Sequence, residues 1–179
     1  MLSGAGKLGE LGAQKLPGTK ALIVTTGGNS VKRFGYLGRL EVELERAGVA
    51  HELFDRIEPN PLRETVNAGG WMARTHDCDF VLALGGGSVM DGSKGICAVA
   101  TNPHTDAEGN ECPGDIWDFV NGGTALGLSI PNDPLPLVCV TTTAGTGSEV
   151  DAGGVLSCED NDEKLRRGHP RLVSGTFDR

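Results

Sequence analysis

The stretch Phe80–Lys94, FVLALGGGSVMDGSK, decides the fold. Its first five residues are apolar without polar alternation, which is typical of a strand buried on both faces of a sheet. Three glycines and a serine follow directly, and a helix is expected from there to about Ala100. A buried strand, a glycine turn and a helix in this order predict one unit of an α/β domain.

The flanking sequence repeats this alternation. Strands are expected over residues 20–25, 49–57 and 136–141, with an edge strand over 153–158. Helices are expected over 1–18, for about 15 residues around Leu40, over 62–75 and near 116–121. Residues 101–115 read as a polar loop, and residues 165–179 lack clear periodicity. The predicted fold class is therefore α/β, with a Rossmann-like, mainly parallel sheet and helices on both faces.

Composition narrows the functional classes. The 179 residues suffice for one domain, and 38% hydrophobic with 22% charged residues favour a soluble globular core. A net charge of −8 without any basic run argues against a nucleic-acid partner. Five cysteines without a CxxC pair favour a reducing, cytoplasmic location. No apolar run is long enough for a membrane span.

The first candidate site is Gly85-Gly86-Gly87-Ser88, between the buried strand and its helix. Unpaired N–H groups and the helix dipole favour an anion there, most simply a pyrophosphate, although such clusters also form plain turns. The sequence has neither a GxGxxG fingerprint nor a GxxxxGK[ST] loop. Asp91 and Lys94 follow on the same helix, either as a solvated ion pair or as part of the site.

The second candidate site is the run from Thr142 to Glu149, directly after the strand over 136–141. Its hydroxyls can bond a ribose, a phosphate or an amide, and ligands bind at such strand ends in parallel sheets. A loop that merely caps a helix is the alternative. Two glycine and hydroxyl loops that both follow buried strands favour a ligand.

The third candidate site is Gly27-Gly28-Asn29-Ser30, with Lys32 and Arg33 beyond it. An acidic residue usually holds the ribose 2′-hydroxyl of NAD, whereas NADP needs room and a cation. The loop has no carboxylate and two cations follow, so the sequence favours NADP(H); an ordinary turn is the alternative. The four histidines form no HxxxH or similar pair, so no metal ligands are assigned.

The runs GGGSVMDGSK (Gly85–Lys94) and TTAGTGSE (Thr142–Glu149) resemble the two signatures of the iron-containing (group III) alcohol dehydrogenases. GGNSVKR (Gly27–Arg33), IEPNP (Ile57–Pro61) and Asp115-Ile116-Trp117 resemble the butanol dehydrogenase and NADPH-dependent aldehyde reductase branch. The resemblance implies that residues 1–179 are the dinucleotide-binding domain of an enzyme acting on small-molecule alcohols or aldehydes. The resemblance is also compatible with a homodimer.

The resemblance also implies roles for individual residues. The pyrophosphate would be bound by Gly85, Gly86, Gly87 and Ser88. The adenine and ribose side would be lined by Thr142, Thr143 and Thr146, with Lys164 on the ribose. A 2′-phosphate would meet Gly28, Ser30 and Lys32, and catalytic Asp91 would lie by the nicotinamide.

Members of the family have about twice this length, including a helical second domain whose aspartate and three histidines bind iron or zinc. That domain is absent from this sequence, which predicts a truncated chain that binds NADP(H) with little or no turnover. A stand-alone nucleotide-binding module without catalysis remains an alternative. A glycerol dehydrogenase-like relative is another, although the runs GGNSVKR and TTAGTGSE argue against it.

Overall fold

The computed structural model describes residues 6–143, 145 and 147–168. Its centre is a four-stranded parallel sheet in the order β2-β1-β3-β6. The strands are β1 (Lys20–Thr26), β2 (Ala50–Ile57), β3 (Phe80–Gly85) and β6 (Leu137–Thr141). Because β2 and β3 pair with opposite edges of β1, the connections change direction there. Such a switch point opens a crevice outside the carboxyl ends of the strands, where α/β proteins bind ligands.

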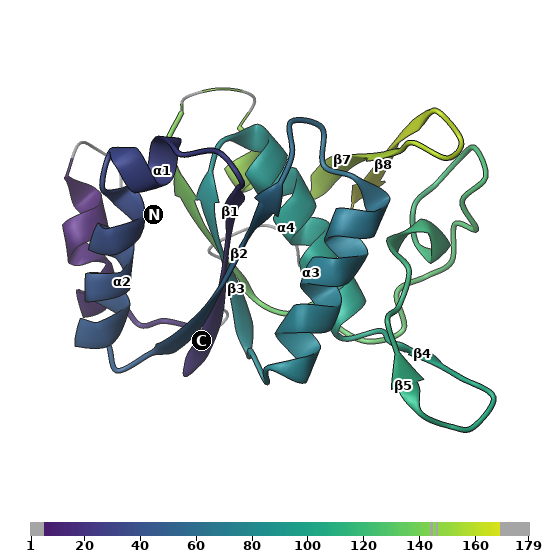
Figure 1. Ribbon diagram of the computed structural model, residues 1–179, viewed down its shortest axis with the longest axis horizontal. Helices are drawn as coiled ribbons and strands as arrows, with labels where there is room; N and C mark the ends of the chain where they lie inside the picture. The colour runs from purple at the N-terminus through teal and green to yellow at the C-terminus, as the bar shows by residue number, and fades with distance from the viewer. Residues whose placement is uncertain (1–5, 144, 146, 169–179) are drawn as a thin grey trace.

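Helices cover both faces of the sheet, as predicted (Figure 1). One face carries the 3₁₀ helix η1 (Lys7–Ala13), α1 (Ser30–Arg33) and α2 (Tyr36–Arg46). The other carries α3 (Arg63–Thr75) and α4 (Gly87–Ala100). No helix within the described part of the chain is both long and apolar enough to cross a membrane.

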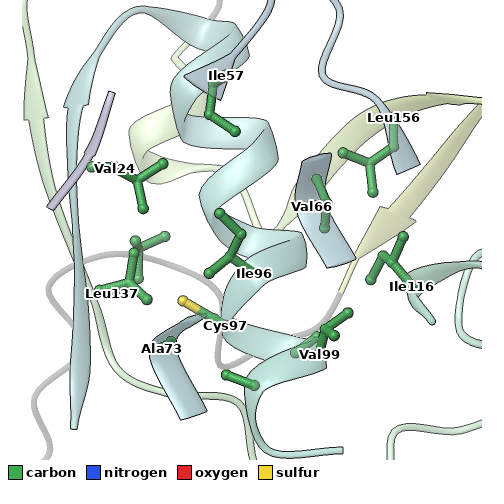
Figure 2. Close-up of a cluster of buried hydrophobic side chains, with 14 of the residues drawn as sticks. Val24, Ile57, Val66, Ala73, Ile96, Cys97, Val99, Ile116, Leu137 and Leu156 are labelled. Atoms are coloured by element: carbon green, nitrogen blue, oxygen red, sulfur yellow. The ribbon is translucent and has the colours of Figure 1, made fainter. Parts of the chain in front are cut away.

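The larger core lies between the sheet and α3 and α4, where side chains from strands and helices converge (Figure 2). Glycines let the two helices approach closely: a Cβ on Gly69 would lie 2.5 Å from Ile96 Cδ1, and one on Gly95 would lie 2.6 Å from Val66 Cγ1. This approach buries α4 on nearly all sides and fixes the position of its first turn.

Four predictions of secondary structure were wrong in detail. The helix expected over 1–18 is a 3₁₀ helix over Lys7–Ala13 in the described part, and the one near 116–121 is only η2 (Ile116–Asp118). The helix around Leu40 is interrupted by Gly35, whose φ of 71° no helix interior allows. The polar loop contains the short strands β4 (His104–Thr105) and β5 (Glu111–Cys112).

The largest omission is β8 (Glu163–Gly168), which lies partly in the segment 165–179, where the sequence has no clear periodicity. It pairs antiparallel with β7 (Gly153–Cys158), so the predicted edge strand belongs to a separate hairpin outside the main sheet. In Figure 1 this hairpin stands on the α3 and α4 side. It contacts α4, and a Cβ on Gly154 would lie 3.0 Å from the Asp91 carbonyl oxygen.

Candidate functional site

The first two candidate loops lie side by side at the carboxyl edge of the sheet. Gly85 is paired with Thr141 at the ends of β3 and β6, and the Thr142 N–H donates to the Gly85 carbonyl over 3.0 Å. A Cβ on Gly86 would lie 4.0 Å from the Thr143 hydroxyl. The two loops therefore flank one space, as a shared ligand requires. Thr146 lies outside the described residues.

Helix α4 begins in this space with its N-terminus uncapped. Gly86 is the N-cap residue, in an extended conformation, and none of the described side chains caps the helix. Gly87 is exposed and Ser88 is half-buried, and the first N–H groups of a helix have no partner within it. A 14-residue helix with a bare N-terminus offers donors and a positive dipole end, which suits a phosphate group.

The Lys94 side chain connects α4 to the second loop. Its ammonium donates to the carbonyl oxygen and hydroxyl of Ser148, over 2.7 and 2.8 Å, and to the Gly153 carbonyl over 2.5 Å. Its side chain is only 2% exposed. Burial lowers the pKa of the Lys94 ammonium, and the Asp91 carboxylate acts in the opposite direction. The reading of Asp91 and Lys94 as a solvated ion pair was therefore wrong.

Asp91 belongs to the same network. One carboxylate oxygen accepts from the Ser148 hydroxyl over 2.5 Å, and the other accepts from the Val155 N–H over 3.1 Å. Its carboxylate also lies 3.9 Å from the Lys94 ammonium. These bonds fix η3 (Ser148–Val150) and β7 against α4, so the network fixes the end of the second loop at Ser148.

The third candidate site follows β1, next to the other two strand ends. Gly28, Ser30 and Lys32 are all exposed there, and the Thr25 hydroxyl donates to the Leu84 carbonyl, tying β1 to β3 below the loops. The Lys32 ammonium donates to the Asp55 carboxylate over 2.6 Å. Sequence reasoning missed Asp55: the loop has no carboxylate, but the neighbouring strand β2 supplies one.

Lys164 lies outside the three candidate loops. It is on β8, opposite Ser157, and its ammonium donates to the Asn60 side chain over 2.7 Å. Asn60 belongs to the turn before α3, and the carbonyl of Pro61 in that turn accepts from the Ser157 N–H. The hairpin thus holds Lys164 against the turn after β2.

Asp115, in the Asp-Ile-Trp run, has a clear structural role. Arg63 binds both of its carboxylate oxygens, and Asn67 and the Trp117 N–H donate to it over 3.0 and 2.9 Å. These hydrogen bonds hold the pKa of Asp115 below its usual value, although burial acts to raise it. The segment after the polar loop is anchored to α3 in this way.

Three candidate metal-ligand atoms come within 4.8 Å of one another at one place in the described part of the chain, on Glu64, Cys158 and Asp160. No histidine belongs to this group. His104 instead contacts Asp118 over 2.6 Å, and His51 lies 3.9 Å from Glu41. His169 is outside the described residues.

Comparisons with known proteins identify relatives of the chain. The sequence profile described as iron-containing alcohol dehydrogenase matches residues 1–176. The probable NADH-dependent butanol dehydrogenase 1 of Bacillus subtilis is 36% identical, with 95% of this chain and 40% of the relative covered. The NADPH-dependent aldehyde reductase YqhD of Escherichia coli is 35% identical, with 99% and 43% covered.

Among solved structures, the archaeal Red Sea brine pool alcohol dehydrogenase ADH/D1 superimposes with a TM-score of 0.83 at 34% identity. The match covers 95% of this chain and 41% of that protein. The chain therefore spans about two fifths of the length of the relatives it matches.

Proposed function

Because this chain belongs to the iron-containing alcohol dehydrogenase family, we propose that residues 1–179 form the dinucleotide-binding domain of an enzyme that interconverts alcohols and aldehydes. The cofactor is NAD(P)(H), with NADP(H) favoured, and the location is cytoplasmic. The observation that carries the proposal is the adjacency of two glycine and hydroxyl loops at one sheet edge, next to an uncapped helix. Five cysteines without a CxxC pair support a reducing compartment.

In this proposal the pyrophosphate lies on the N-terminus of α4, against Gly85–Ser88. Thr142, Thr143 and Thr146 line the adenine and ribose side, and Lys164 reaches the ribose. Asp91, on the turn of α4 after Ser88, lies at the nicotinamide end. When bound, the nicotinamide supplies hydride transfer, and the chain's task is to bind and orient it.

The residues described here do not fit the metal that the family name implies. An aspartate and three histidines are expected, whereas the candidate ligand group in the described part contains Glu64, Cys158 and Asp160. No catalytic step is therefore assigned to a metal in this chain. We expect the 179-residue chain alone to bind the dinucleotide with little or no alcohol oxidation.

Ser88 allows a direct test, because it is the second residue of α4. In Ser88→Asp, the new carboxylate interacts favourably with the positive end of the helix dipole and stabilises the helix by about 0.5 kcal/mol. The same charge repels a pyrophosphate, so NADPH affinity should fall on the order of 100-fold in isothermal titration calorimetry. Ser88→Ala is the matched control, with a loss of about tenfold or less.

If the wild-type chain binds neither NADPH nor NADH, the proposal is contradicted. Equal affinity of Ser88→Asp and wild type for NADPH would place the pyrophosphate elsewhere. Metal-dependent alcohol oxidation by the 179-residue chain would contradict the expected lack of turnover.

A further inference from the structure

An exposed ion pair stands beside the glycine loop that follows β1. It joins Lys32 of α1 to Asp55 near the end of β2, with 2.6 Å between Nζ and Oδ2. The Lys32 side chain is 46% exposed and the Asp55 side chain 35% exposed. Both charged groups can therefore be reached by a ligand at this edge of the sheet.

A β-bulge places Asp55 in this position. Val24 of β1 is paired with Phe54 of β2, and Thr26 is paired with Ile57, so β2 has one residue more than β1 between these two pairs. Bulges redirect side chains and often occur next to active sites. A Cβ on Gly27 would lie 3.2 Å from the Asp55 carbonyl oxygen, so the bulge directly adjoins the glycine loop.

The two groups have opposite preferences for the ribose 2′ position of a dinucleotide. In doubly wound folds a carboxylate accepts a hydrogen bond from the 2′-hydroxyl of NAD, whereas a nearby cation accommodates the 2′-phosphate of NADP. Here the carboxylate and the cation bind each other. The hydrogen bond from Lys32 holds the pKa of Asp55 below its usual value, so Asp55 is ionised at neutral pH.

We propose, on the basis of the dinucleotide-binding function above, that Lys32 and Asp55 together select between NADP(H) and NAD(H). Lys32 binds the 2′-phosphate of NADP(H), and Asp55 accepts from the 2′-hydroxyl of NAD(H). To bind the phosphate, Lys32 must release Asp55, whose uncompensated charge then opposes the phosphate. To bind the hydroxyl, Asp55 keeps its contact with Lys32. The pair thus limits the preference for NADP(H) to a modest one.

The two single variants should act in opposite directions. Asp55→Asn removes the repulsive charge and should raise NADPH affinity about tenfold while weakening NADH binding. Lys32→Gln removes the cation and should lower NADPH affinity about tenfold with little effect on NADH. The affinities are measured by isothermal titration calorimetry with the 179-residue chain. Adenosine 5′-monophosphate, with and without a 2′-phosphate, serves as a second probe pair.

Lys20 and Glu52 provide the matched control. They form an ion pair across the same two strands, with 3.2 Å between Nζ and Oε1, and their side chains are 30% and 33% exposed. Lys20 begins β1, at the opposite edge of the sheet from the glycine loops. Lys20→Gln and Glu52→Gln should therefore leave the ratio of NADPH to NADH affinity unchanged.

The expected result is a ratio that rises in Asp55→Asn, falls in Lys32→Gln and returns toward the wild-type value in the double variant. If both single variants bind the two cofactors with the wild-type ratio, the selector role is wrong although dinucleotide binding stands. If the wild type binds neither cofactor, the proposed function fails and the selector role fails with it. Circular dichroism melting curves identify any variant whose lost binding reflects unfolding.

Discussion

Two lysine–aspartate pairs serve the same edge of the sheet, and burial gives them different roles. Lys94 is 2% exposed, bonds to Ser148 and Gly153, and lies 3.9 Å from Asp91. Lys32 is 46% exposed and bonds to Asp55 over 2.6 Å. A buried ammonium must keep all its partners because water cannot replace them, whereas an exposed ammonium can exchange one anion for another. The first pair therefore fixes the site, and the second is available to the ligand.

The largest effect expected from this contrast is on stability. Lys94→Met leaves Asp91 and two carbonyl oxygens without their buried cation, and should lower the free energy of unfolding by about 3 kcal/mol or more. Urea denaturation of the 179-residue chain measures the loss.

Ser93 is the matched control on the same helix. Its hydroxyl is fully buried and has no hydrogen-bond partner among the described residues. Ser93→Ala therefore removes an unsatisfied polar group and should leave stability unchanged or raise it by about 1 kcal/mol. If Lys94→Met cost no more than Ser93→Ala, the buried network would not hold the loop.

A smaller effect concerns pH. Burial lowers the pKa of Lys94 in the folded protein, so the unfolded chain binds more protons between that lowered pKa and 10.5. The free energy of unfolding of the wild type, relative to Lys94→Met, should therefore rise with pH through this window and level off above it. Urea denaturation at a series of alkaline pH values measures the difference, and a relative stability that falls with pH would contradict a lowered pKa of Lys94 in the folded protein.

The smallest effect is expected at the exposed pair. Lys32→Gln and Asp55→Asn should each change the free energy of unfolding by about 0.5 kcal/mol or less, because water screens the charges. The same urea experiments measure it. A loss of unfolding free energy close to the one expected for Lys94→Met would mean that the exposed pair has a structural role. It would contradict the proposed difference between the two lysine–aspartate pairs.

The sequence predicted β1, β3 and β6 because each is a short apolar run followed by glycine or hydroxyl residues, as in FVLALGGGS. The more polar β2, AHELFDRI, was predicted between Gly48, which ends a helix, and a turn with two prolines. Periodicity did not predict β8, because the sequence EKLRRG has little apolar character and is ordered by pairing with β7. It missed the interruption at Gly35, since glycine within a helical pattern does not reveal its φ.

The sequence likewise predicted some parts of the candidate site and missed others. The loops after β1, β3 and β6 were found because their composition marks them. The burial of Lys94 was missed because a lysine is usually exposed, although the sequence GSVMDGSKGICAVA is apolar enough for a helix buried on all sides. Asp55 was missed because only the parallel pairing of β1 with β2 brings it to Lys32.

The most direct test is a titration of the ¹⁵N-labelled 179-residue chain with NADPH, followed by amide NMR shifts. A dinucleotide held by both loops should produce its largest shifts at Gly86, Ser88 and Thr143, together. Shifts concentrated at the opposite edge of the sheet, near Lys20 and Asp79, or in only one of the two loops, would contradict a single ligand between them.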